Sequence, residues 1–257
     1  MDKLHNIRHT LAHLLASAVQ EFDPGVQFGI GPVTDDGFYY DFLFSPGKTP
    51  TPEDLKTLQR AMQKLVNKKL PMEGKELSHA EGLAFFKDQP MKIELINEFS
   101  GEGKTMTTYS VGNFTDLCKG GHVDNTSEID GESFVLTKIA GAYWRGDQKN
   151  QMLTRIYGIA FETKEELDAY ITMLEEAKKR DHRKLGKELG LFTFSELVGP
   201  GLPLWTPKGT LLRETLNDYV WALRSAKGYQ RVAIPHITKS DLYKTSGHWA
   251  KYSDDLF

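Results

Sequence analysis

The sequence has a single cysteine, Cys118, and no long run of apolar residues. One cysteine cannot form an intramolecular disulfide, so the composition favours a reducing compartment, and we expect a cytoplasmic protein. The longest apolar runs are too short to cross a bilayer, and no apolar export segment follows the first residues. We therefore expect no membrane partner.

The chain also carries little net charge, −3 in 257 residues. A total charge of that size does not indicate a nucleic-acid partner, although a local basic face would be enough for one. Hydrophobic residues make up 39% of the chain and charged residues 26%. These proportions are typical of a globular protein, and the length suits one or two domains.

Residues 4–20 have the period of an amphipathic helix with one apolar stripe. The stripe consists of Leu4, Ile7, Leu11, Leu14, Leu15 and Ala18. His9 and His13 are four residues apart, so they share one side of this helix, roughly opposite the stripe. For this stretch alone, two solvated surface histidines are a simpler interpretation than a pair of ligands.

Strand and helix patterns alternate irregularly up to residue 161, which predicts an α+β domain. The predicted strands are residues 26–30, 38–44, 105–111, 134–140 and 152–161. Thr51 with Pro52 predicts a helix N-cap, and Ser78 with Glu81 predicts a capping box. Lys92 interrupts an apolar run, where a lysine often extends its amine to the surface.

A helical pattern that ends in the basic run 178–184 is predicted to connect two domains. The run suits either nucleic-acid phosphates or a solvated helix end. Beyond it, the sequence predicts loops, a helix through residues 211–223 and a strand at 228–235 that ends on Pro235. About seventy residues make a thin core for a separate domain, so we expect a second domain that is cut short.

Residues 116–122 form a glycine-rich loop in which Cys118 and His122 are four residues apart. We expect this loop and the first helix to fold together, so that three imidazoles and one sulfur line a single cleft. His9, His13, Cys118 and His122 would then form either a zinc site or a proton-transfer site. A third possibility is that Cys118 is a covalent nucleophile with His122 as its base.

Several short segments, in this order along the chain, resemble the threonyl-tRNA synthetase family. They are RHTLAH (8–13), GIGPV (29–33), GFYYD (37–41), DLCKGGH (116–122), AYWRGD (142–147), RIYG (155–158), KRDHRK (179–184) and SGHW (246–249). Residues 228–235 resemble motif 1 of class II synthetases. The histidine and cysteine pairs alone would suit alanyl-type editing proteins equally well, and motif 1 with residues 246–249 distinguishes the two.

The resemblance implies a mixed α/β editing domain at residues 1–160 and a linker helix at 161–186. Residues 187–257 would be the first part of a class II catalytic core, an antiparallel sheet with helices. It implies a ligase that joins threonine to tRNA(Thr) with ATP, Mg²⁺ and one Zn²⁺, and that forms a homodimer through the motif 1 region. The editing domain would hydrolyse seryl-tRNA(Thr).

By the same resemblance, six side chains form the editing site. They are His9, His13, Lys92, Asp116, Cys118 and His122. His9 or His13 with Cys118 would order a water molecule, Lys92 would hold a ribose hydroxyl or neutralise developing charge, and Asp116 would bind the substrate amino group. We expect editing to need no metal; zinc on the three histidines and the cysteine is the alternative.

The chain departs from the family pattern in two respects. The family usually begins with a small ubiquitin-like domain, whereas here the histidine helix begins almost at once, and motifs 2 and 3 and the core zinc ligands would lie beyond Phe257. We therefore expect that this chain alone does not activate threonine. Two other interpretations stay open, a free-standing trans-editing deacylase and a non-catalytic tRNA-binding paralogue.

Overall fold

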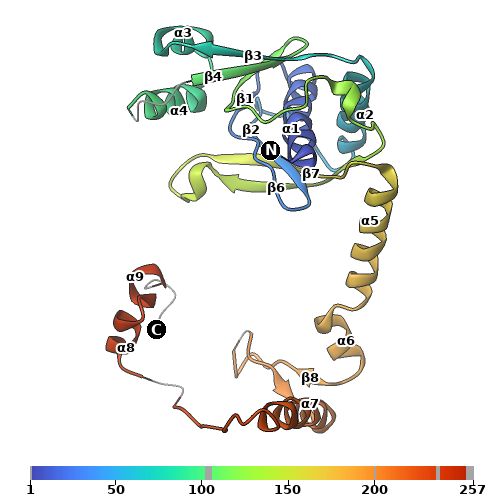
Figure 1. Ribbon diagram of the computed structural model, residues 1–257, viewed down its shortest axis with the longest axis vertical. Helices are drawn as coiled ribbons and strands as arrows, with labels where there is room; N and C mark the ends of the chain where they lie inside the picture. Colours follow the sequence, from blue (N-terminus) through green and yellow to red (C-terminus); the bar gives the residue numbers. More distant parts are fainter. Residues whose placement is uncertain (1, 102–105, 200, 236–237, 253–257) are drawn as a thin grey trace. The chain divides into compact units, whose positions relative to one another are not determined.

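Figure 1 shows the computed structural model, which describes residues 2–101, 106–199, 201–235 and 238–252. The chain divides into two compact units, Met1–Ala177 and Lys178–Phe257. The predicted α+β class is confirmed, because helices and antiparallel sheets both occur. None of the helices in the described stretches combines the length and the hydropathy needed to cross a membrane.

The first unit contains a four-stranded antiparallel sheet. Its strands, in spatial order, are β1 (Gln27–Phe28), β2 (Gly37–Leu43), β7 (Met152–Ala160) and β6 (Phe134–Tyr143). Side chains alternate along a strand, so Phe38, Tyr40 and Phe42 of β2 share one face, and all three are fully buried. Two helices, α1 (Lys3–Phe22) and α2 (Leu55–Asn67), complete this core (Figure 1).

A second antiparallel sheet of the first unit has the order β3 (Met72–Leu77), β4 (Met106–Val111) and β5 (Phe114–Leu117). Beside it lie α3 (His79–Phe85) and α4 (Pro90–Gly101). A small cluster of Phe86, Ile96 and Met106 joins these elements. Two short 3₁₀ helices, η1 (Thr126–Glu128) and η2 (Trp144–Gly146), lie in the connections between strands. The end of β5 approaches α1, which brings residues 116–118 beside the first helix.

Most of the predicted elements of the first unit are confirmed. The helix at residues 4–20 is α1, and Ser78 and Glu81 form the predicted capping box of α3. The predicted N-cap at Thr51 is wrong. The helix begins at Leu55, and the Asp54 carboxylate accepts hydrogen bonds from the Thr51 N–H and hydroxyl at 2.7 and 2.8 Å. The strand predicted at 105–111 begins at Met106 in the structure, and residue 105 lies outside the described residues.

The connecting segment contains two helices rather than the single predicted one. Helix α5 (Lys164–Lys179) ends within the basic run, and α6 (His182–Glu188) follows it. Asp181 separates them because its side chain accepts a hydrogen bond from the Arg183 N–H and so caps a new helix.

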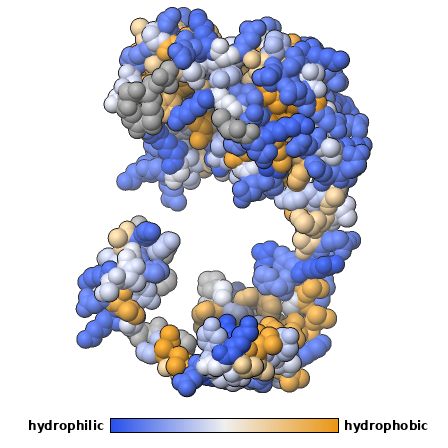
Figure 2. Space-filling model, in the orientation of Figure 1, coloured by the Kyte–Doolittle hydropathy of each residue, from blue (hydrophilic) through white to orange (hydrophobic). Residues whose placement is uncertain are grey.

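Among its described residues, the second unit has few buried apolar side chains. It contains β8 (Phe192–Thr193), β9 (Leu204–Trp205), α7 (Pro207–Ser225), α8 (Ser240–Thr245) and α9 (His248–Tyr252). On α7, Leu211, Leu216 and Tyr219 are each more than 60% exposed. On the face drawn in Figure 2, hydrophobic residues reach the surface of this unit.

The strand predicted at residues 228–235 is wrong. Residues 229–235 belong to no helix or strand, and Val232 and Ile234 are 80% and 76% exposed. A strand is stable only when a neighbour pairs with its backbone groups. Among the described residues, no strand pairs with this segment, so an apolar pattern alone does not make it a strand.

Candidate active site

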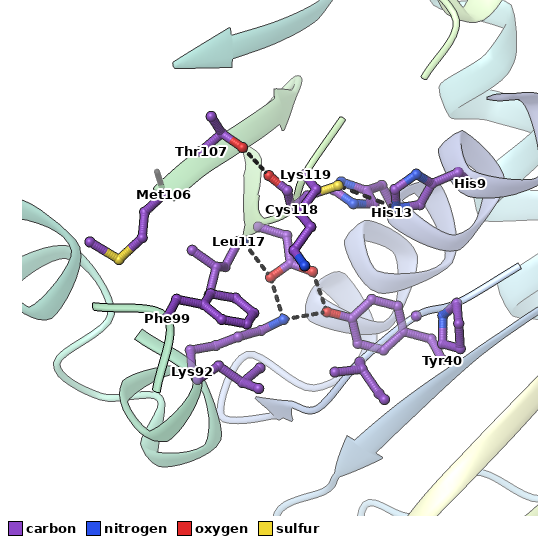
Figure 3. Close-up of a pocket in the computed structure, with 15 residues that line it drawn as sticks. His9, His13, Tyr40, Lys92, Phe99, Met106, Thr107, Leu117, Cys118 and Lys119 are labelled. Atoms are coloured by element: carbon purple, nitrogen blue, oxygen red, sulfur yellow. Dashed lines mark hydrogen bonds and ion pairs between the residues drawn. The ribbon is translucent and has the colours of Figure 1, made fainter. Parts of the chain in front are cut away.

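A pocket of about 420 Å³ lies in the first unit, between α1, β2, α4 and the end of β5 (Figure 3). One part of its wall is apolar and consists of Ile30, Pro32, Leu95, Phe99, Met106 and Leu117. The other part holds titratable side chains in two groups. We call His9, His13, Cys118 and His122 the imidazole–thiol cluster, and Lys92, Asp116 and Tyr40 the ion-pair network.

The imidazole–thiol cluster is assembled from one helix and one loop. Helix α1 places His9 and His13 one turn apart, because residues i and i+4 of a helix share a side. The loop after β5 turns back towards them through Gly120 and Gly121, whose φ angles of 89° and 86° are rare for residues with a Cβ. One ligand atom from each of the four side chains lies within 4.8 Å of the others.

The Cys118 thiol is at the centre of this cluster. Its Sγ lies 3.2 Å from His9 Nε2 and 3.2 Å from His122 Nε2. The rings of His9 and His122 stack with their centroids 4.1 Å apart, and the His13 ring meets His122 edge-on at 4.4 Å. The cluster is therefore a set of directly packed aromatic and sulfur groups.

Burial keeps the imidazole–thiol cluster uncharged. Removal from water lowers the pKa of His9, lowers the pKa of His13 well below its usual value and lowers that of His122 to about 2. The neighbouring imidazoles add to these shifts. Burial also raises the pKa of the Cys118 thiol to about 11. At pH 7 the cluster therefore contains neutral imidazoles and a neutral thiol.

The ion-pair network carries full charges in a buried place. Lys92 Nζ on α4 lies 2.5 Å from Asp116 Oδ1 on β5, and the two side chains are 2% and 5% exposed. Lys92 also donates to the Tyr40 hydroxyl at 3.1 Å, and that hydroxyl donates to Asp116 Oδ2. Burial and the Asp116 carboxylate raise the pKa of Tyr40 well above its usual value, so the phenol keeps its proton.

The ion-pair network keeps some hydrogen-bonding capacity for a ligand. A carboxylate offers about four lone-pair directions, and Asp116 uses three of them, for Lys92, for Tyr40 and for the Leu117 N–H at 2.7 Å. An ammonium has three N–H donors, and within the described part of the chain Lys92 uses two. One acceptor on Asp116 Oδ2 and one donor on Lys92 therefore remain beside the pocket.

The structure brings all six predicted site residues together. His9, His13, Lys92, Asp116 and Cys118 line the pocket, whereas His122 packs behind His9 and Cys118. Three imidazoles and one sulfur thus form one group, but only two of the imidazoles face the cavity.

Two expectations about exposure are wrong. His13 is 2% exposed, because β5 and the loop after it cover the side of α1 that faces away from the apolar stripe. Lys92 does not extend its amine to the surface. It is 2% exposed and pairs with Asp116.

Tyr40 is a site residue that the sequence analysis placed in a strand but did not single out for the site. It alternates with Phe38 and Phe42 and is buried as they are. A signal was present, because a tyrosine on the core face of a strand needs a hydrogen-bond partner for its hydroxyl. The partner, Asp116, is 76 residues away.

The imidazole–thiol cluster fits the ligand types of a zinc ion. Tetrahedral zinc with nitrogen and sulfur ligands holds neighbouring ligand atoms roughly 3.5 Å apart, close to the two 3.2 Å separations around Cys118. His9 Nδ1 lies 3.3 Å from the Gly121 carbonyl oxygen, an arrangement common for metal-bound histidines. His13 Nδ1 is buried without a hydrogen-bond partner among the described residues, so a ligand would satisfy it.

Comparison with known proteins relates this site to aminoacyl-tRNA synthetases. Residues 106–157, which include Asp116, Cys118 and His122, match the family model described as "Threonyl and Alanyl tRNA synthetase second additional domain". The match extends from β4 to β7 and therefore covers the part of the first unit that supplies the glycine-rich loop.

Curated relatives extend the similarity to the rest of the chain. The chain is 50% identical to a threonine--tRNA ligase of Gloeobacter violaceus, 49% to one of Porphyromonas gingivalis and 46% to one of Streptococcus suis. These alignments cover 100%, 98% and 100% of this chain but 41%, 38% and 39% of the relatives. The chain thus spans about two fifths of the length of the curated relatives it matches. Over its whole length, the chain is related to threonine--tRNA ligases, and it corresponds to a part of them that contains the second additional domain.

Proposed function

We propose that the pocket hydrolyses the ester bond of seryl-tRNA(Thr), and that the chain is the editing part of a threonine--tRNA ligase with the beginning of its catalytic domain. One observation carries the proposal. A neutral proton acceptor and a fixed pair of charges with unused hydrogen-bonding capacity face the same cavity. Hydrolysis of an aminoacyl ester needs both kinds of group.

A threonine-specific ligase needs such a site for a physical reason. Serine lacks one methyl group of threonine, and a missing methyl is worth only about 1–3 kcal/mol of discrimination. A synthetic site shaped for threonine therefore accepts some serine. A second site that removes the serine corrects the error.

His9 is the proton acceptor in this mechanism. Its side chain lines the pocket, it is neutral at pH 7, and its Nε2 lies beside Cys118. A water molecule would donate a hydrogen bond to His9 Nε2 and attack the ester carbonyl carbon. His9 takes the water proton during the attack. The bond from that carbon to the ribose oxygen then breaks, the ribose oxygen takes up this proton from His9, and free serine and tRNA are released.

The ion-pair network would position the substrate. The open acceptor on Asp116 Oδ2 suits the serine ammonium group, and the open N–H of Lys92 suits a ribose hydroxyl or the developing oxyanion. Cys118 serves as a neutral hydrogen-bond donor. With a pKa of about 11 its thiolate is scarce at pH 7, which argues against covalent catalysis by this residue.

Zinc remains an alternative within the same proposal. His9, His13, Cys118 and His122 would hold the ion, and zinc would polarise an ester oxygen or lower the pKa of a bound water. Four protein ligands would close the coordination shell, whereas a catalytic zinc keeps one position open. We therefore favour hydrolysis without metal. Metal analysis of protein purified without added zinc tests this preference.

For the whole protein we propose ligation of threonine to tRNA(Thr) with ATP and Mg²⁺, and one Zn²⁺ in the catalytic core. We also propose a cytoplasmic location and a homodimer formed through the motif 1 region. The exposed apolar side chains of α7, just before residues 228–235, support a partner there. Residues 1–160, 161–186 and 187–257 remain our proposed editing domain, linker and first part of the catalytic core.

The test is an incubation of the chain with seryl-tRNA(Thr) and threonyl-tRNA(Thr), with free serine and threonine measured over time. Selective release of serine supports the proposal. Binding of tRNA without release would support a non-catalytic paralogue instead. A free-standing deacylase would release serine in the same way, and it is distinguished by a gene that encodes no motifs 2 and 3.

A further inference from the structure

Thr10 lies between His9 and His13 on α1 and contacts His122, the third imidazole of the imidazole–thiol cluster. The residue is 0% exposed. Its Oγ1 lies 2.8 Å from the Asn6 carbonyl oxygen, 3.2 Å from the Val123 backbone nitrogen and 3.3 Å from His122 Nδ1. Three polar groups from two segments of the chain therefore meet at one buried hydroxyl.

The hydrogen positions at this hydroxyl follow from its valence. A threonine hydroxyl has one proton and two lone pairs. The Asn6 carbonyl can only accept, so it takes the proton, and the Val123 N–H can only donate, so it takes one lone pair. All three contacts are hydrogen bonds when the remaining lone pair faces His122 Nδ1 and that nitrogen carries the imidazole proton.

The Nδ1–H tautomer of His122 adds an acceptor for the thiol proton. Neutral His122 with its proton on Nδ1 has a bare lone pair on Nε2, which lies 3.2 Å from Cys118 Sγ. The Gly121 carbonyl, 3.3 Å from His9 Nδ1, can only accept, so His9 also presents a bare Nε2 to the same sulfur. One S–H proton faces two imidazole nitrogens at 3.2 Å and, farther away, the Gly120 carbonyl oxygen at 4.0 Å. If it is donated to His122, then His9 Nε2, which lines the pocket, is left for a bound water.

We propose that Thr10 is a positioning residue for the hydrolytic reaction, because its hydroxyl holds His122 in the Nδ1–H tautomer and so gives the Cys118 proton an imidazole acceptor other than His9. Thr10 does not touch the substrate in this account. Its effect on hydrolysis rests on the function proposed above. The tautomer of His122 is independent of that proposed function, and it can be measured without any substrate.

The experiment measures the ¹⁵N chemical shifts of the histidine side chains by NMR in the full chain, together with seryl-tRNA(Thr) hydrolysis. In the wild type we expect His122 as a single Nδ1–H tautomer. Thr10→Val keeps the shape and removes the hydroxyl, so we expect the Nε2–H tautomer to become populated and kcat to fall about 10-fold. KM should change much less. Thr10→Ser restores the hydroxyl, and we expect it to restore the tautomer and most of kcat.

Thr126 provides a matched control. It is also 0% exposed, and its hydroxyl binds only backbone groups, including the Leu70 N–H at 2.9 Å and the Val66 carbonyl at 3.2 Å. Thr126→Val should leave both the His122 tautomer and kcat unchanged, so a general effect of removing a buried hydroxyl is separated from a specific one.

Two results would overturn the inference. The first is a wild-type His122 with its proton on Nε2, which decides the matter even when Thr10→Val does not fold. The second is a folded Thr10→Val protein with an unaltered tautomer and an unaltered kcat. Failure of the wild type to hydrolyse seryl-tRNA would instead reject the proposed function, and the tautomer measurement would still decide the assignment at Thr10.

Discussion

The imidazole–thiol cluster and the ion-pair network lie in the same pocket but differ in charge. In the cluster, burial has shifted every pKa towards the neutral form. In the network, a lysine and an aspartate pair at 2.5 Å and share a tyrosine hydroxyl. An unpaired buried charge is strongly unfavourable, so a buried group either loses its charge or gains a partner. In this pocket the cluster has lost its charges and the network has paired them.

The difference suggests a division of labour. A neutral imidazole is ready to accept a proton at pH 7, and a preorganised charge pair can hold an ammonium group and stabilise an oxyanion. The cluster should therefore contribute mainly to the rate of hydrolysis. The network should contribute to binding and also strongly to the stability of the fold.

The largest expected effect is the loss of one charge from the network. Lys92→Met leaves Asp116 buried without its partner, which typically destabilises a protein by about 3–5 kcal/mol. The free energy of unfolding from urea titration measures this. The double variant Lys92→Met/Asp116→Leu should recover most of the loss, because no unpaired charge remains. A double variant as unstable as the single one would contradict this account of the network.

An exposed ion pair gives the matched comparison. Lys3 and Glu162 also approach to 2.8 Å, but their side chains are 60% and 37% exposed. Water and salt screen such pairs. Lys3→Met should therefore reduce the free energy of unfolding much less than Lys92→Met does.

Removing the proton acceptor of the cluster should mainly affect the rate. We expect His9→Ala to lower the rate of seryl-tRNA hydrolysis about 100-fold, within the range that general-base catalysis contributes. Unfolding stability should change little, because His9 is neutral and only half-buried. His5→Ala is the control, since His5 lies one turn earlier on the same helix and is exposed. Equal rates in His9→Ala and wild type would remove His9 from the mechanism.

The smallest expected effect is a dependence of stability on pH that comes from the cluster. The pKa of His122 is about 2 in the folded state and about 6.5 when unfolded. Between these values the unfolded chain binds more protons, so the free energy of unfolding falls as the pH decreases below about 6.5.

One such histidine contributes up to about 1.4 kcal/mol per pH unit. We expect His122→Gln to make the dependence shallower by an amount of this order between pH 6 and pH 4. Urea titrations of the variant and the wild type at several pH values measure the difference. Parallel curves for the two proteins would show that His122 is not held neutral by burial.

The sequence predicts the cluster better than the network for a physical reason. Helical geometry alone brings His9 and His13 together, and two glycines in the loop with Cys118 and His122 predict a tight turn. The network joins α4, β5 and β2, and no local pattern shows that Lys92, Asp116 and Tyr40 meet. The resemblance to a known family supplied the first two of these residues but not the third.

The same reason explains the other differences between prediction and structure. The helical period of the apolar residues predicts the apolar stripe of α1. The burial of His13 on the opposite side depends on a loop more than 100 residues away in the sequence. Residues 228–235 have the apolar pattern of a strand, but pairing decides whether a strand forms. Each of these errors has the same cause. The outcome depends on whether residues far apart in the sequence come into contact, and a short stretch of sequence does not show this.

The central claim is that the serine ester lies between the imidazole–thiol cluster and the ion-pair network. A crystal structure of the chain with a seryl-adenosine analogue, in which an amide replaces the ester, tests it most directly. The account predicts the serine ammonium group within hydrogen-bond distance of Asp116 Oδ2 and the amide carbonyl beside His9. An analogue bound outside this pocket, or bound inside it with the serine turned away from both groups, would contradict the account.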